Sequence, residues 1–277
     1  MTALDFPGVP GPAGSAGPAP ARRLSPVTGL RNTFTLTWRS LLKLKTNYEE
    51  ILSLSLTPIM YLLLFTYVFG GAVSGNVHNY LQYVLPGILV ISVVFSTLGT
   101  GMALSQDMAT GVFDRFRSLP ISRTAPLAGA VLGDVARYAI SVAISLLFGM
   151  LLGFRIQTSP LAAVAGCLLV LVFAMAMCWF SALLGLLVKQ ARSVQWMGSL
   201  IYFPLTFGSN VLVKTSTLPG WMQAFVKGNP LTFLTEAERG LLVGGPVATP
   251  VIRSLLWALG LFVVFAPLAV RAYRRKT

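Results

Sequence analysis

Few side chains in this sequence could carry out nucleophilic or metal chemistry. The chain has one histidine, His78, and two cysteines, Cys167 and Cys178. A metal site or a Ser-His-Asp arrangement needs several such groups close together, and we interpret His78 as a solvated loop residue. The cysteines share one apolar run, where on one helix they would lie beyond the Cα spacing of a disulfide, about 6 Å. We therefore expect no metal site and interpret both cysteines as packing residues.

The carboxylates offer two further candidates for chemistry. Asp134 is followed three residues later by Arg137 on the same expected helix face, which predicts an ion pair at the cytoplasmic start of a span. A role in ion coupling is the alternative. Glu236 and Glu238 are two residues apart, so their side chains would point in different directions on a helix, which disfavours a catalytic pair. We expect a chain that is not an enzyme.

The sequence also contains no G-x-x-x-x-G-K-[ST] pattern, the glycine-rich loop whose backbone N–H groups hold nucleotide phosphates. We therefore expect the chain not to hydrolyse ATP on its own and to hold no cofactor.

Composition sets the environment in which these residues must be positioned. The chain has 277 residues, of which 55% are apolar and 10% are charged, against about 25% charged in ordinary soluble domains. A soluble fold of this size could not bury so much apolar surface, so lipid is the expected solvent. The net charge is +13, but the basic residues lie between long apolar runs. We interpret them as a topology signal and expect no nucleic-acid partner.

The apolar runs predict an all-α polytopic membrane protein with six transmembrane helices, since a span needs about 20 apolar residues. None of the runs alternates as a barrel strand does. The expected spans cover about residues 51–69, 83–104, 127–154, 161–188, 194–213 and 251–270.

Segments outside the spans have their own patterns. Residues 1–25 are rich in Pro, Gly and Ala, which predicts a disordered cytoplasmic tail before a permease domain over residues 26–277. Residues 26–48 have an apolar face and a basic stripe, which predicts a helix lying in the inner interface of the membrane. Residues 214–250 predict two short external helices, re-entrant or lying on the surface, with a break at Gly228-Asn229-Pro230.

Most Lys and Arg residues precede the first span, follow the second and fourth spans, or follow the last one. The positive-inside rule therefore predicts that both termini are cytoplasmic. Residues 106–123, QDMATGVFDRFRSLPISR, then lie on the cytoplasmic side between the second and third spans. Asp107 can cap a short amphipathic helix and Pro120 can end it. An ordinary connector is the plain interpretation of such a helix, and a surface offered to a partner is the functional one.

This segment reads D-x-x-x-G-x-x-D-R-F-R-S-L-P-x-S-R. It resembles the cytoplasmic loop of type-2 ABC exporter permeases, particularly the daunorubicin/doxorubicin-resistance group. Three other segments resemble the same family: YVLPGILV at 83–90, FPLTFGSN at 203–210 and LPGWMQAFVKGNPLTFLTEAERGLL at 218–242. The resemblance covers about residues 30–275. One departure is that QDMATG carries fewer acids than many relatives, which bears on charge pairing with an ATPase.

The resemblance implies a permease subunit of a bacterial plasma-membrane exporter for an amphipathic drug-like, lipid or polyketide-like substrate. It implies a second permease chain, as a homodimer, and two copies of an ABC ATPase that bind ATP and Mg. Coupling to the ATPase would fall to Asp107, Gly111, Asp114, Arg115, Arg117, Pro120 and Arg123. The substrate pathway would include Tyr61, Phe65, Phe95, Tyr202, Phe203, Phe207 and Asn210. In a membrane span, however, such aromatics commonly face lipid or pack against neighbouring helices.

The alternative function is a secondary transporter or channel that is not driven by ATP. Such proteins are expected to have repeated halves and an ionisable residue near the bilayer midplane. The sequence has no convincing internal repeat, and we interpret none of its acids as lying at the midplane. An integral membrane enzyme would need a reactive cluster, which the sequence lacks.

Overall fold

The computed structural model describes residues 48–71, 75–110, 125–188, 190–213 and 215–276. Every regular element in these ranges is a helix. The expected tail, 1–25, lies outside the described residues, as does nearly all of the expected interfacial helix, 26–48. Within the described ranges, the expected all-helical class is therefore confirmed.

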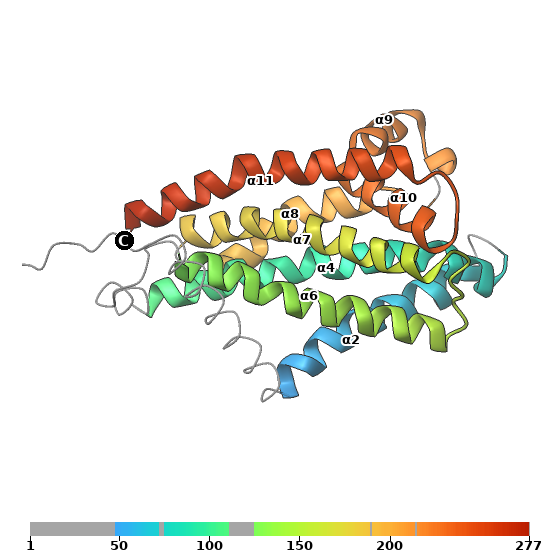
Figure 1. The fold of residues 1–277 in the computed structure, drawn as a ribbon, viewed down its shortest axis with the longest axis horizontal. Coiled ribbons are helices and arrows are strands. Elements are labelled where there is room, and N and C mark those ends of the chain that lie inside the picture. The colour runs from blue at the N-terminus through green and yellow to red at the C-terminus, as the bar shows by residue number, and fades with distance from the viewer. Residues whose placement is uncertain (1–47, 72–74, 111–124, 189, 214, 277) are drawn as a thin grey trace, which may run out of the picture.

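The helices form an up-and-down bundle (Figure 1). In Figure 1, α4, α7 and α11 run in one direction, whereas α2, α6 and α8 run in the other, and α9 and α10 lie at the end opposite the finish of α11. The bounds are α2 Tyr48–Leu64, the π-helix η1 Phe65–Phe69, α4 Val77–Ala109, α6 Ala125–Leu151, α7 Pro160–Leu187, α8 Ala191–Phe207, the 3-10 helix η2 Thr215–Thr217, α9 Gly220–Gly228, α10 Pro230–Leu242 and α11 Ala248–Lys276.

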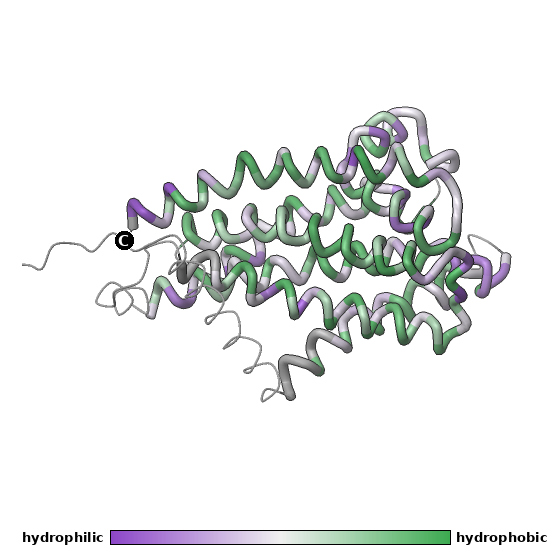
Figure 2. Tube along the Cα trace, in the orientation of Figure 1, coloured by the Kyte–Doolittle hydropathy of each residue, from purple (hydrophilic) through white to green (hydrophobic). Residues whose placement is uncertain are grey.

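Four helices are long and apolar enough to cross a membrane: Val77–Ala109, Gly129–Leu151, Pro160–Leu187 and Ala248–Arg275. A shorter apolar helix covers Ser55–Phe69. Apolar residues line the long helices, and hydrophilic ones gather mainly towards the two ends of the bundle (Figure 2). Large apolar side chains such as Leu200 on α8 and Leu256 on α11 are exposed. Exposed apolar surface of this extent is expected of a protein that lipid surrounds.

Local signals fix where several helices begin. The Asn76 side chain accepts a hydrogen bond from the His78 backbone N–H, at 2.8 Å, and so caps α4. Ser159 caps α7 and is followed by Pro160, and Asn229 caps α10 and is followed by Pro230. A polar cap before a proline is a strong helix start, because the proline occupies a position whose N–H would have no helical partner.

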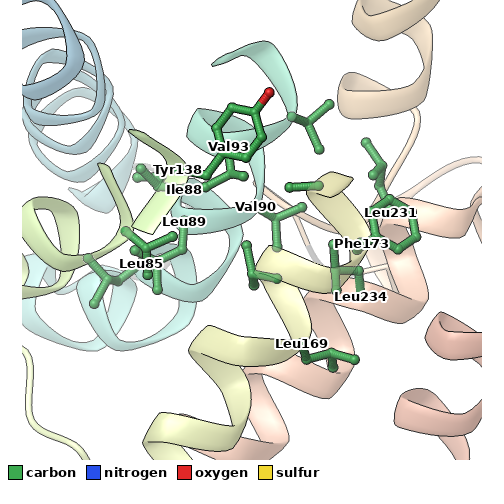
Figure 3. Close-up of a cluster of buried hydrophobic side chains, with 14 of the residues drawn as sticks. Leu85, Ile88, Leu89, Val90, Val93, Tyr138, Leu169, Phe173, Leu231 and Leu234 are labelled. Atoms are coloured by element: carbon green, nitrogen blue, oxygen red, sulfur yellow. The ribbon is translucent and has the colours of Figure 1, made fainter. Parts of the chain in front are cut away.

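The core is built around α4. Buried side chains of α4 such as Leu85, Ile88 and Leu89 meet residues of α6, α7 and α10 in one apolar cluster (Figure 3). The α4 and α7 backbones approach closely where Gly101 faces Ser181 and Gly185, and a Cβ at either glycine would overlap the backbone carbonyl of the other helix. Small residues of this kind allow the backbones of two membrane helices to pack closely against each other.

The fifth expected span, 194–213, is helical over only part of its length. α8 ends at Phe207, and residues 208–213 are not helical. The reason lies in the partners of the α8 C-terminus, whose last carbonyls need donors. The Asn229 side-chain amide donates to the carbonyls of Leu205, at 2.6 Å, and Gly208, at 2.8 Å. The chain then passes through η2 into α9 and α10, the two short helices expected on either side of Asn229.

Candidate functional site

A pocket of about 450 Å³ lies among α2, α4, α6 and α8. From α4 it is lined by Ser92, Phe95, Ser96 and Gly99, whose spacing of three and four residues places them on one helix face. The other helices contribute Thr57, Pro58, Tyr61, Asp134, Arg137, Tyr138, Gln195 and Ser199. The pocket thus combines aromatic, hydroxyl, amide and charged groups within an apolar bundle.

One wall of the pocket is a buried polar cluster around Asp134. Arg137 donates to Asp134 at 2.9 Å, which confirms the ion pair expected from their spacing. The Thr100 hydroxyl donates to the second carboxylate oxygen and lies 2.8 Å from the Tyr138 hydroxyl. A buried carboxylate is costly unless paired and hydrogen-bonded, and Asp134 has both kinds of partner. The ion pair and hydrogen bond offset part of the cost of burying the carboxylate, and the cluster presents polar groups to the pocket.

A group of packed aromatic rings extends from Phe95, which lines the pocket, to α8. The Phe95 ring packs edge-on against Tyr202, with centroids 5.9 Å apart, and against Phe203, at 5.4 Å. Phe203 stacks on Phe207 at 5.7 Å. Tyr202 is fully buried, and its hydroxyl lies 2.9 Å from the Thr97 hydroxyl. Aromatic surface with a few fixed polar groups is typical of a small-molecule site.

The expected pathway residues do not lie in one place. Tyr61 and Phe95 line the pocket. Phe65 is buried and packs against Tyr61 with centroids 6.2 Å apart. Of the α8 aromatics, Tyr202 is buried, whereas Phe203 and Phe207 are exposed. Asn210 lies apart from the pocket, in a second polar cluster.

This second cluster joins α10 to α4 and to the non-helical segment after α8. The Asn210 amide donates to Glu236 at 2.8 Å. Arg239 donates to the carbonyls of Tyr83, Asn210 and Val211 at 3.0, 2.7 and 2.9 Å, and its guanidinium lies 3.7 Å above the Tyr83 ring. Burial raises the pKa of Glu236, and the nearby positive charge of Arg239 opposes that rise. These contacts hold the segment after α8 in place.

Of the residues expected to couple to an ATPase, only Asp107 lies in the described part of the chain. Gly111, Asp114, Arg115, Arg117, Pro120 and Arg123 lie outside it. We expected Asp107 to cap a separate short helix. This prediction is wrong, because Asp107 lies in the last turn of α4. No glycine or proline interrupts residues 102–109, so the helix continues to Ala109 and is capped by Thr110.

Sequence reasoning missed most of the polar lining. Ser92, Ser96 and Gly99 recur at spacings of four and three within an apolar span, a pattern that indicates a polar stripe on one face. This pattern could have predicted the polar lining from the sequence. The contact between Thr100 and Asp134 could not be predicted, because it joins two helices whose relative position no local pattern specifies.

The sequence is similar to a known family of membrane transporters. Residues 31–243 match the family described as ABC-2 type transporter. The chain is 40% identical over 262 residues, 95% of this chain and 91% of the relative, to the daunorubicin resistance ABC transporter permease protein DrrB1 of Streptomyces coeruleorubidus. It is 26% identical over 88% of both chains to the probable doxorubicin resistance ABC transporter permease protein DrrC of Mycobacterium tuberculosis. It is 29% identical to the putative transport permease ycf38 of Cyanophora paradoxa, over 76% of this chain and 74% of the relative.

The apolar helices and the polar pocket between them define a multi-pass α-helical membrane protein. The extent of the family match, with the identity to DrrB1, then makes the assignment specific: the chain belongs to the ABC-2 type transporter family of membrane permeases.

Proposed function

We propose that this chain is the transmembrane subunit of an exporter that a separate ATPase drives and that moves an amphipathic, drug-like, lipid or polyketide-like substrate outward. The observation that carries the proposal is the 40% identity, over 95% of the chain, to a permease named for daunorubicin resistance. The pocket supports it, because aromatic rings beside an ion pair suit a ligand with both an apolar ring system and polar groups.

In the proposed assembly the chain crosses the membrane six times and has both termini in the cytoplasm. Besides the four long helices, α2 with η1 forms one span and α8 the other. Together α2 and η1 cover 17 and 5 residues, or about 33 Å at 1.5 Å per residue, enough for a hydrocarbon core of about 30 Å. α8 has 17 residues, or about 26 Å, and the non-helical segment after it would complete the crossing.

We further propose that two copies of this chain assemble with two copies of the ATPase, which binds ATP and Mg. The exposed apolar side chains of α8, among them Trp196, Leu200 and Phe203, support a second permease chain beside α8. The segment 106–123 would be the contact with the ATPase, as its resemblance to the family's cytoplasmic loop implies.

The coupling segment is tested by the double variant Arg115→Glu/Arg117→Glu, reconstituted with the ATPase. Reversing charges at a partner interface typically costs at least about 2 kcal/mol of binding free energy, or about 30-fold in affinity. The variant should insert and melt as the wild type does, and it should lose ATPase association or substrate-stimulated hydrolysis. The matched control is Arg274→Glu/Arg275→Glu, which reverses two exposed charges at the end of α11. Equal, wild-type assembly of both variants would disprove the coupling role.

The pocket is tested by ATP-dependent uptake of a fluorescent anthracycline into inverted vesicles. Gly99 lines the pocket, and a Cβ added there would meet nothing within 4 Å, so Gly99→Phe introduces a ring at the pocket without backbone overlap at its Cβ. Uptake should fall while the melting temperature stays constant. Gly260→Phe is the control, because Gly260 on α11 also has no neighbour within 4 Å of an added Cβ. Unchanged uptake by Gly99→Phe would exclude this pocket, and uptake by the chain alone without ATPase would favour a secondary transporter.

A further inference from the structure

Glu238 on α10 is a buried acid that neither the pocket nor the Arg239 cluster uses. Its side chain is 0% exposed. Neither carboxylate oxygen has a hydrogen-bond partner among the residues that the structure describes. Its neighbours on the same helix differ in this respect, since Glu236 accepts from Asn210 and Arg239 donates to three carbonyls. Glu238 is thus set apart from the polar network around it.

The Glu238 carboxyl group lies against bare backbone of α7. A Cβ at Gly166 would be 2.8 Å from one carboxylate oxygen and 3.1 Å from the other. The glycine therefore leaves room for the carboxyl group itself, at the point where α10 packs on α7. A larger residue at this α7 position would have to displace the Glu238 carboxyl group.

No positive charge is in ion-pair contact with Glu238 in the described part of the chain. The titratable group on α7 that feels its charge is the Cys167 thiol. Arg239 donates to the carbonyls of Tyr83, Asn210 and Val211, and the first charged residue of α11 is Arg253, which is exposed and lies over the Phe233 ring. α7 itself has no charged residue between Pro160 and Leu187.

An isolated carboxylate in such surroundings is strongly destabilised, and the group takes up a proton instead. Burial raises the pKa of Glu238 from 4.5 to about 8. The uncharged acid has no charge to desolvate and so costs less to bury in a tight apolar interface than the carboxylate, which needs water or a cation. The packed arrangement of α10 and α7 and the proton on Glu238 therefore stabilise each other.

We propose that Glu238 is a proton-binding site, which holds a proton while α10 packs on α7 and releases that proton to water when the two helices separate. On release the O–H bond breaks, a water molecule accepts the proton, and the solvated carboxylate remains; closure reverses the step. α10 is placed to respond to movement of the pocket helices, because Asn229 at its start also holds the C-terminus of α8. Each opening of this contact would then be coupled to one protonation equilibrium.

Infrared spectroscopy of the full chain in lipid bilayers tests the proton directly. At neutral pH, the difference between wild type and Glu238→Gln should contain the carbonyl stretch of a protonated carboxylic acid. This band should disappear with a midpoint near pH 8. Glu236→Gln is the matched control, since Glu236 is hydrogen-bonded to Asn210, and this variant should keep the band. Should Glu238→Gln fold poorly, Glu238→Met removes the same group with a similar volume.

A wild-type spectrum without this band at neutral pH, or a band that Glu238→Gln retains, would overturn the proposal. The release step is tested in the complex with the ATPase, trapped with ATP and vanadate. The band should lose intensity on trapping, and an unchanged band would overturn the release step. Because the first measurement uses the permease alone, its result is independent of whether the exporter function proposed above is correct.

Discussion

Arg239 should be among the residues on which the fold depends most strongly. Its side chain is partly buried, and its guanidinium donates to the carbonyls of Tyr83, Asn210 and Val211. Asn210 and Val211 lie outside any helix, so no helical N–H replaces the guanidinium as donor. Replacing Arg239 by Met removes all three bonds and the contact above the Tyr83 ring.

The size of the loss follows from these contacts. A hydrogen bond to a charged group contributes about 1.5–3 kcal/mol, but the variant no longer has to bury a cation. The net cost should therefore lie below the sum of three such bonds, at about 3–5 kcal/mol, since three carbonyl acceptors lose their donor. At about 2–4 °C per kcal/mol, Arg239→Met should lower the melting temperature by roughly 6–20 °C. The melting temperature of Arg239→Lys should lie between those of the wild type and Arg239→Met, since an ammonium group cannot reach three carbonyls as the planar guanidinium does.

The assay is thermal unfolding of the purified full chain in detergent, followed by tryptophan fluorescence. Arg253→Met is the control, because Arg253 is exposed and its guanidinium lies 5.2 Å from the Phe233 ring centre. An exposed contact of that kind is worth about 0.5–1 kcal/mol. If Arg239→Met melts within the range of Arg253→Met, the three carbonyl contacts do not hold the α10 region together, and our account of this cluster is wrong.

Three further outcomes follow from packing and charge. Gly101→Leu should destabilise the bundle by several kcal/mol and reduce the yield of folded protein, because the added Cβ overlaps the α7 backbone. Gly260→Leu is the control and should leave stability and yield unchanged, since an added Cβ there meets nothing within 4 Å. The pKa of Glu238 is higher in the folded state than its ordinary value of 4.5, so the contribution of its protonated form to folding stability is complete below pH 4.5 and is lost as the pH rises through about 8. The melting temperature of the wild type should therefore fall between these two pH values, and that of Glu238→Gln should fall less. Tyr202→Phe, which removes one buried hydroxyl contact with Thr97, should cost about 1 kcal/mol in chemical unfolding.

The sequence predicted what depends on local pattern. The all-helical class followed from apolar length, and the Asp134–Arg137 ion pair followed from a spacing of three on one helix face. The end of α8 could not be placed, because its last carbonyls are held by Asn229, a residue of another element. Glu238 was assigned to an external helix and given no role, since its burial depends on Gly166 of α7, far away in the sequence.

The position of α4 suggests how the two polar clusters and the segment 106–123 are related. α4 has 33 residues, or about 50 Å at 1.5 Å per residue, about 20 Å more than the hydrocarbon core of a bilayer. It carries Tyr83 of the Arg239 cluster near one end, the pocket-lining stripe from Ser92 to Gly99 in between, and Asp107 in its last turn. The helix is continuous over this length, with Pro86 between Tyr83 and Ser92 and no proline between Ser92 and Asp107. On the proposed function, a displacement that an ATPase imposes on residues 106–123 would therefore reach the pocket through one rigid element, without a flexible joint at Asp107. The same displacement would reach α10 through the Tyr83 carbonyl and Arg239, which is why loss of Arg239 should weaken coupling as well as stability.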